Sequence, residues 1–261
     1  MIGYMVNAII PIRVGGEIVR AYIINWKEKV GLPQSLSSVA VERVLDLLAI
    51  LALAAGSLTF LPAGTQLPKW MFQAMQAIGV LVLLCLVALG FAAFKSRWLL
   101  ARVEKFASRL PFLGARRKEK LGEFLKLLVE GATSTLRHPL AMAATMILTF
   151  VIWAILFASI YVFFIGFGIQ ASIPLILLGV MIFQLTFILP SSPGGLGTFE
   201  AAWIIIFTGL GLPQVDQMLA IALVTHFGNL ILVLALGSAG IALLGLTFGE
   251  VIQLPLKRRV T

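Results

Sequence analysis

The sequence is poor in cysteine and in charged residues. Its one cysteine, Cys85, lies inside the apolar run AIGVLVLLCLVALGFAAF, so no intramolecular disulfide can form. Charged residues make up 12% of the chain, against roughly 25% in a soluble domain. Hydrophobic residues make up 60%, and the mean hydropathy is +1.05. This composition excludes a soluble globular protein and indicates an integral membrane protein.

Other motifs are also missing. The first residues, MIGYMVNAIIPIR, have no small-residue cleavage site after a basic flank, so we expect no cleaved signal peptide. No cluster of residues has the spacing of metal ligands, and no nucleophile motif is present. We therefore expect no metal and no cofactor, and we expect the chain not to be an enzyme.

Long apolar runs recur along the whole chain. A helix needs about 20 mostly apolar residues to cross a bilayer. This rule predicts spans at Leu36–Leu61, Trp70–Phe94, Leu140–Phe164, Ile173–Leu189 and Gln217–Leu246. Two further apolar segments, Ile2–Ile24 and Phe199–Leu212, are too short or too interrupted for ordinary spans. We expect an all-α, polytopic transmembrane helical bundle with broken or re-entrant helices, forming one domain over residues 1–261.

Positive charge is concentrated between two of these spans. Residues 95–137 hold eleven Lys and Arg against four Asp and Glu, and the chain ends in LKRRV. The positive-inside rule places both segments in the cytoplasm, in a multi-pass protein of the cell membrane. Helical spacing in SRWLLARVEKFASRL predicts amphipathic helices on the leaflet that attract acidic headgroups. A loop that only fixes topology is the alternative, and neither reading implies a nucleic-acid partner.

Ionisable residues also occur in the apolar segments. Each would cost roughly 2.5–3.5 kcal/mol at a helix centre, so they must be paired or face water. Snorkelling to the interface is the alternative for Arg20, Glu42 and Arg43. Glu42, Arg43 and Asp46 fall within an arc of about 100° on their helix. The full set is Arg13, Glu17, Arg20, Glu42, Arg43, Asp46 and Glu200.

Two of the charged segments echo one another. PIRVGGEIVRA (Pro11–Ala21) and PSSPGGLGTFEAA (Pro190–Ala202) each run from proline through a Gly-Gly pair to a glutamate that opens an apolar helix. Such breaks survive in a membrane only inside protein or beside water, and paired breaks point to an inverted repeat around a central site. The residues expected to break the helices are Pro11, Gly15, Gly16, Pro190, Pro193, Gly194, Gly195 and Gly197.

Three blocks carry a family resemblance. NAIIPIRVGGEIVRAYII, SSVAVERVLDLLAIL and LPSSPGGLGTFEAA, in this order, resemble the flippase-like membrane proteins related to the transmembrane region of lysylphosphatidylglycerol synthetase. The resemblance implies movement of an amphiphilic lipid, either phospholipid or polyprenyl-linked, between leaflets. Family members usually carry further helices before the first block, so the N-terminus is a candidate for truncation. No soluble synthetase domain follows Thr261, so we do not expect this chain to aminoacylate lipids.

Together these patterns predict a polar site for a lipid headgroup. Arg13, Arg20 and Arg43 would hold a phosphate, and the carboxylates would balance them or receive a cationic headgroup. Glu200 would form one wall of this shared site. His226 and Asn229 would face the same cavity, although a packing role is the alternative for His226.

The expected partners are membrane lipids, anionic or aminoacylated, and a lipid-modifying enzyme. An intramembrane transferase acting on a lipid-linked substrate is a rival function, with Glu42 and Asp46 as an acid and base pair. A regulatory or scaffolding membrane protein is a third.

Overall fold

The computed structural model describes residues 1–9, 14–65, 67–94, 122–123, 126–127, 129–131, 134, 138–188, 192–212 and 214–257. All regular secondary structure in these ranges is helical, which confirms the predicted all-α membrane bundle. The helices are α1 (Ile2–Ile9), α2 (Val14–Glu28), α3 (Leu32–Thr59), α4 (Lys69–Phe94), α7 (Pro139–Gly166), α8 (Ile173–Leu185), α9 (Thr198–Gly209), α10 (Val215–Leu243) and α11 (Phe248–Lys257), with short 3-10 helices η1 (Thr186–Ile188) and η2 (Pro193–Gly195).

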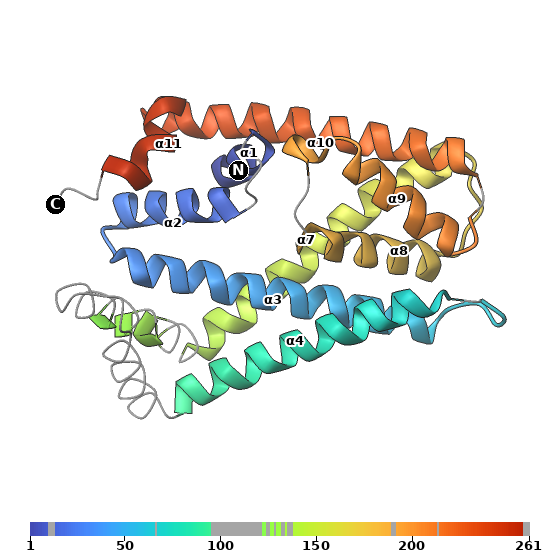
Figure 1. Ribbon diagram of the computed structural model, residues 1–261, viewed down its shortest axis with the longest axis horizontal. Coiled ribbons are helices and arrows are strands. Elements are labelled where there is room, and N and C mark those ends of the chain that lie inside the picture. Colours follow the sequence, from blue (N-terminus) through green and yellow to red (C-terminus); the bar gives the residue numbers. More distant parts are fainter. Residues whose placement is uncertain are drawn as a thin grey trace, which may run out of the picture.

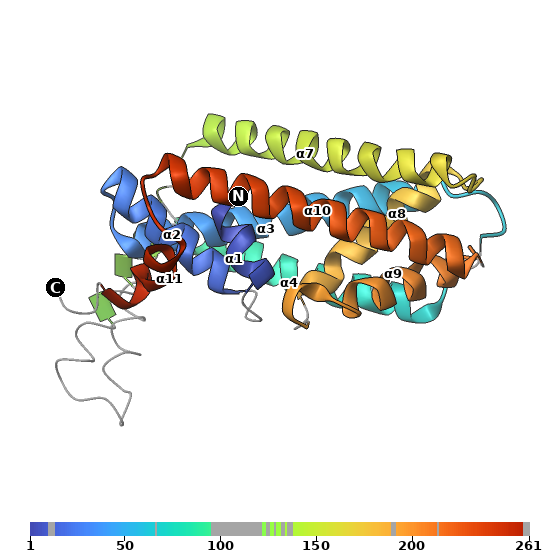
Figure 2. The ribbon, with the colours of Figure 1, turned by 90° about the horizontal axis from the view of Figure 1, so that it is seen from above.

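Four long helices form the frame of the molecule. α3, α4, α7 and α10 have 28, 26, 28 and 29 residues, which corresponds to about 40 Å each and exceeds a hydrocarbon core of about 30 Å. They extend along the molecule's longest axis in Figure 1, and Figure 2 shows α7 on the outside of α10. Among the described residues, α7 and α10 are long and apolar enough to cross a membrane.

Two pairs of short helices occupy the space between the long ones. α1 and α2 have 8 and 15 residues, and α8 and α9 have 13 and 12. At 1.5 Å per residue, these helices reach only about 12–22 Å, so none crosses a bilayer alone. The prediction of a full span at Ile173–Leu189 is therefore wrong. The apolar run is long enough, but its α-helix ends at Leu185 and continues as η1.

The two pairs lie toward opposite ends of the molecule. In Figure 1, α2 fills the half nearer α11, whereas α8 and α9 fill the other half, and η2 lies near the middle beside α1. α1 packs against α2, α10 and η2. α1 and η2 thus lie in contact, near mid-length of α10 in Figure 1.

The apolar core lies in the half that contains α8. That helix is enclosed on nearly all sides, because α3, α7 and α9 pack around it. Gly179 permits the close approach of α9, since a Cβ there would lie 2.4 Å from a ring carbon of Phe207. Phe164, Trp203 and Phe207 are fully buried in this cluster. This core fixes α9 and therefore the position of Glu200 in its first turn.

The turns gather at the two ends of the frame. The α3–α4, α7–α8 and α9–α10 connections lie together at one end in Figure 1, and α11 and the start of α7 lie at the other. The basic segment 95–137 falls almost wholly outside the described residues. Its predicted amphipathic helices and its cytoplasmic location remain predictions, as does the cytoplasmic location of the C-terminus.

Candidate functional site

A network of ion pairs joins α2 to the middle of α3. Arg20 makes a two-pronged contact with Glu42, in which Nη1 donates to Oε1 at 2.9 Å and Nη2 pairs with Oε2. Arg43 pairs with Glu17 at 2.7 Å and with Asp46 at 3.1 Å. All five ionisable residues are among those predicted from the sequence. They neutralise one another almost fully, with two positive and three negative side chains.

These residues lie deeper along their helix than the sequence suggested. α3 begins at Leu32, ahead of the predicted Leu36, so Glu42, Arg43 and Asp46 lie around its middle rather than near its end. Their ion-pair partners are other side chains of the network, and snorkelling to the interface stays the alternative interpretation. The network is nevertheless not sealed: Arg20 and Arg43 expose 35% and 36% of their side chains.

Tyr4 of α1 completes the network and was missed by the sequence reasoning. Its hydroxyl accepts a bond of 3.4 Å from Arg43 Nη2, and its ring lies 5.8 Å from the guanidinium carbon. Two buried atoms of the network, Oε2 of Glu17 and Nε of Arg43, have no hydrogen-bond partner among the described residues. One is an acceptor and the other a donor, so the network has unused capacity for a polar ligand or water.

Asn7 fixes the start of α2, and it too was missed. Its Oδ1 accepts from the Gly16 backbone N–H at 2.7 Å, one of the N–H groups that a helix leaves unpaired at its start. Gly15 and Gly16 lie inside the first turn of α2 rather than in the break, which corrects the prediction. Gly16 is required for packing, because a Cβ there would lie 2.0 Å from the Gly3 carbonyl oxygen.

A second polar group lies at the other break. Glu200 and His226 are 8% and 5% exposed, and Oε1 of Glu200 is 2.6 Å from Nδ1 of His226. Oε2 of Glu200 accepts from the Gly197 N–H at 2.8 Å. Nε2 of His226 donates to the Gly194 carbonyl oxygen at 2.8 Å. The pair therefore ties α10 to both ends of the Gly-rich segment.

The backbone of this segment explains its glycines. Gly194, Gly195 and Gly197 have φ values of +63°, +78° and +78°. Residues that carry a side chain rarely adopt this left-handed backbone conformation. The residues turn the chain from η2 into α9, whose first turn carries Glu200. Phe199 stacks on the His226 ring at 4.2 Å with an interplanar angle of 10°. The far side of the break, at 189–191, lies outside the described residues, and Pro190 with it.

The structure separates the predicted shared site into two groups. Glu200 is buried, but it bonds to His226 and Gly197 rather than to the network of Glu17 and Arg43. The helix α1 lies between the groups, since Tyr4 contacts Arg43 while the backbone of α1 packs on η2. Asn229 is exposed in the isolated chain and joins neither group within the described ranges. Arg13 and Pro11 lie outside those ranges.

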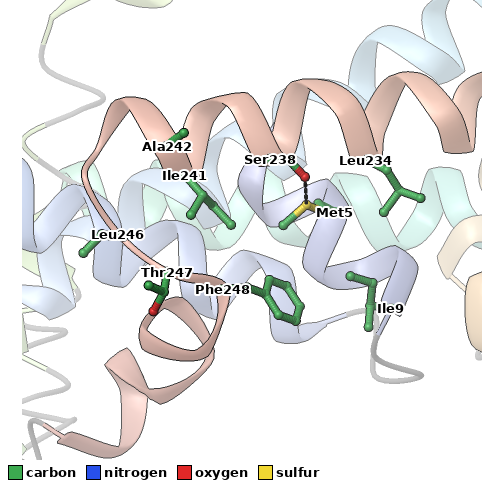
Figure 3. A pocket seen from close by; sticks show the side chains of 9 residues that line it. All are labelled: Met5, Ile9, Leu234, Ser238, Ile241, Ala242, Leu246, Thr247 and Phe248. Carbon is green, nitrogen blue, oxygen red and sulfur yellow. Dashed lines mark hydrogen bonds between the residues drawn. The ribbon is translucent and has the colours of Figure 1, made fainter.

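An apolar groove runs along the other side of α1. Figure 3 shows Met5 and Ile9 of α1 facing Leu234 and Ile241 of α10, with Phe248 of α11 between Thr247 and Ile9. The Ser238 hydroxyl donates to the Met5 sulfur at 3.7 Å, so its hydrogen is engaged. The groove is open to the surface and has a volume of about 320 Å³. Its lining is suited to hydrocarbon.

A comparison with known protein families covers most of the chain. Residues 1–237 match the model of the lysylphosphatidylglycerol synthase transmembrane region. The chain belongs to this family. No solved structure matches it. Membership in the lysylphosphatidylglycerol synthase transmembrane family confirms the resemblance seen in the sequence blocks.

Three relatives extend the comparison. A UPF0104 membrane protein of Methanothermobacter thermautotrophicus is 24% identical, covering 96% of this chain and 75% of that protein. A second UPF0104 membrane protein of that organism is 25% identical, covering 87% and 70%. The protein named Glycosyltransferase AglD of Haloferax volcanii is 28% identical over 84% of this chain, which spans only 38% of AglD.

The comparisons overturn one expectation. We expected the chain not to be an enzyme, but its family is described as the membrane region of a synthase, and one relative is named a glycosyltransferase. A missing nucleophile motif was a poor basis for that exclusion, because group transfer between two bound substrates needs only positioned acids and bases. The expectation is withdrawn.

Proposed function

We propose that the chain binds the headgroup of a phosphate-bearing, amphiphilic lipid at the network on α1, α2 and α3, and moves the lipid between leaflets. The observation that carries the proposal is the network's partial exposure at mid-length of α3. Arg43 is 36% exposed and Asp46 22%. Charges in contact with lipid tails would be costly, so these side chains face water or a polar ligand.

Arginine is the expected phosphate ligand in this network. The guanidinium fork matches phosphate oxygens, and Arg20 and Arg43 lie on neighbouring helices joined by their carboxylate partners. These carboxylates hold the forks in place and balance their charge. A phosphate would replace a carboxylate, which would then be available to a cationic headgroup. The Nε of Arg43, which has no partner in the described part of the chain, offers one further donor.

The apolar groove supports an amphiphilic substrate. α1 contributes Tyr4 to the network and Met5 and Ile9 to the groove. A short helix therefore has a polar contact on one side and an apolar groove on another. In this proposal the headgroup contacts the network while a hydrocarbon chain enters the groove, and α1 lies between the two parts of the lipid.

A leaflet assay tests the proposal. The purified chain is reconstituted into liposomes with fluorescent phosphatidylglycerol, and an impermeant quencher reports the label in the outer leaflet. We expect the wild type to expose inner-leaflet label. Arg43→Gln and Asp46→Asn should each slow this at least about tenfold, the effect of losing a charged hydrogen bond. Asp216→Asn is the matched control, because Asp216 is exposed in the first turn of α10.

The outcome can also reject the proposal. Equal quenching in wild type, Arg43→Gln and protein-free liposomes would show that the chain does not move this lipid. Movement by Arg43→Gln that is as fast as movement by Asp216→Asn would contradict a site built on this network.

A transferase acting on a lipid-linked substrate is the second candidate. The match to Glycosyltransferase AglD over 84% of this chain favours it. Glu42 and Asp46 would then act as the acid and base. Mass spectrometry of the same liposomes after incubation with sugar nucleotides separates the two functions, because transfer changes the mass of the lipid and translocation does not.

A further inference from the structure

The contacts of Glu200 and His226 fix how many protons the pair holds. A carbonyl oxygen only accepts, so the 2.8 Å contact with Gly194 requires a hydrogen on Nε2 of His226. The 2.6 Å contact between Nδ1 and Oε1 also needs one hydrogen. That hydrogen belongs either to the imidazolium or to the carboxylic acid. In both cases the pair is neutral overall and shares one removable proton.

Losing this proton must break one of the two contacts. A neutral imidazole carries one N–H. If the hydrogen stays on Nε2, the Nδ1 lone pair faces the Glu200 carboxylate. If it moves to Nδ1, the Nε2 lone pair faces the Gly194 carbonyl oxygen. Beside an ionised Glu200, a neutral histidine can therefore hold Glu200 or Gly194, but not both.

We propose that Glu200 and His226 form a proton-binding site that latches the second helix break, and that the break opens when the shared proton leaves to water. The site extends the proposed function by naming the proton as the ion that controls movement of the break. It rests on the contacts of the pair and needs no substrate. The backbone tied down by the latch is η2 and the first turn of α9.

The described neighbours of the pair are uncharged. Both residues of the pair are buried, with Phe199 stacked on the His226 ring and Phe227 beside it. α8 presents Phe183 to Phe199, and α1 presents the Ala8 carbonyl to Gly194. None of these described neighbours carries a titratable group. Removing the proton would leave a net negative charge that no cation of the described ranges bonds, which favours opening toward water.

The Glu200→Gln variant separates a proton latch from a structural contact. A glutamine amide can donate to Nδ1 of a neutral His226 and can still accept from the Gly197 N–H. His226 then keeps its hydrogen on Nε2 and its bond to Gly194. Every hydrogen bond is preserved, but no proton is left to lose. This variant should stay latched at high pH, whereas the wild type should open.

Amide hydrogen exchange of the full chain in liposomes measures the latch. Protection of the amides of residues 197–201 is compared between wild type and Glu200→Gln at each pH, because the ratio removes the intrinsic pH dependence of exchange. We expect wild-type protection to fall relative to the variant by roughly tenfold as pH rises, the effect of one lost buried hydrogen bond. His226→Ala should be unprotected at every pH.

Two results would overturn the proposal. One is a wild-type protection that stays constant with pH relative to the amides of α7, which serves as the internal reference. The other is a Glu200→Gln protection that falls in parallel with the wild type. If the variant does not fold, the wild-type curve against α7 still decides. A working latch in a protein that moves no labelled lipid would reject the proposed function alone.

Discussion

The two arginines of the network have different numbers of acidic partners. Arg20 bonds to one carboxylate, that of Glu42, whereas Arg43 lies between Glu17 and Asp46 and also contacts Tyr4. Removing Arg43 therefore leaves two acidic side chains without their cation in an apolar setting. Removing Arg20 leaves one. The cost of an ion pair in the membrane lies mainly in what remains after one partner is lost.

Arg43→Gln should accordingly destabilise the fold more than Arg20→Gln. The side chains are about one-third exposed, so we expect a difference of about 1–2 kcal/mol rather than the full cost of a buried charge. Thermal unfolding in detergent measures it. The Arg20→Gln/Glu42→Gln double variant should lose less than the sum of its single variants. An additive double variant would mean that the pair does not interact in the folded protein.

For single residues, the sequence predicts which charged side chains need a partner, but not which residue that partner is. The cost of isolated charges in lipid required partners for Arg20, Glu42 and Arg43, and the helical arc grouped the acids of α3. The choice of Glu42 by Arg20 depends on how α2 packs on α3, which no local pattern encodes. Glu200 finds His226 on another helix for the same reason. One sequence signal could have located Tyr4 and Asn7, because both are polar side chains within an apolar segment.

Among the elements, α1 and α2 form the pair whose packing is most constrained. Gly3 and Gly16 face one another so closely that a Cβ on Gly16 would lie 2.0 Å from the Gly3 oxygen and 2.6 Å from Asn7. A Cβ on Gly15 would have no atom of the described chain within 4 Å. The adjacent glycines therefore have different roles, although the sequence motif treats them alike. The sequence motif predicted the position of the break to within a few residues. It wrongly placed both glycines in the break rather than in the first turn of α2.

The comparison of Gly16→Ala with Gly15→Ala tests this difference. Gly16→Ala must push α1 away and lengthen the Asn7 bond to the Gly16 N–H, so we expect a loss of about 1–3 kcal/mol. Gly15→Ala should be neutral or slightly stabilising, because alanine favours helix. Melting temperatures of both variants in the same detergent give the answer. Similar melting temperatures would mean that α1 does not pack on α2 this closely.

For the whole molecule, the arrangement of the turns predicts a topology. The α3–α4 turn and the α9–α10 turn lie at the end opposite α11. If the basic segment is cytoplasmic, Thr65 is outside and Glu28 is inside. In a Cys85→Ala background, an impermeant thiol reagent should label Thr65→Cys in intact cells and Glu28→Cys only after permeabilisation. The reverse pattern would place the basic segment outside and contradict the positive-inside prediction.

The overall architecture was predictable because membrane helices obey a length rule that local sequence satisfies. Pro139–Gly166 and Val215–Leu243 lie close to the predicted spans. The rule failed at Ile173–Leu189, where apolar composition continued past the end of α8. Composition indicates the solvent around a segment, whereas the end of a helix depends on backbone geometry and on the elements packed against it.

The position of α1 has a thermodynamic consequence. This helix of 8 residues contacts the charged network through Tyr4 and packs on η2, whose Gly194 is held by His226. A ligand that displaces α1 and a proton whose loss releases η2 therefore act on one shared element. By linkage, the factor by which lipid binding changes proton affinity must equal the factor by which the proton changes lipid affinity. Measuring either one determines the other.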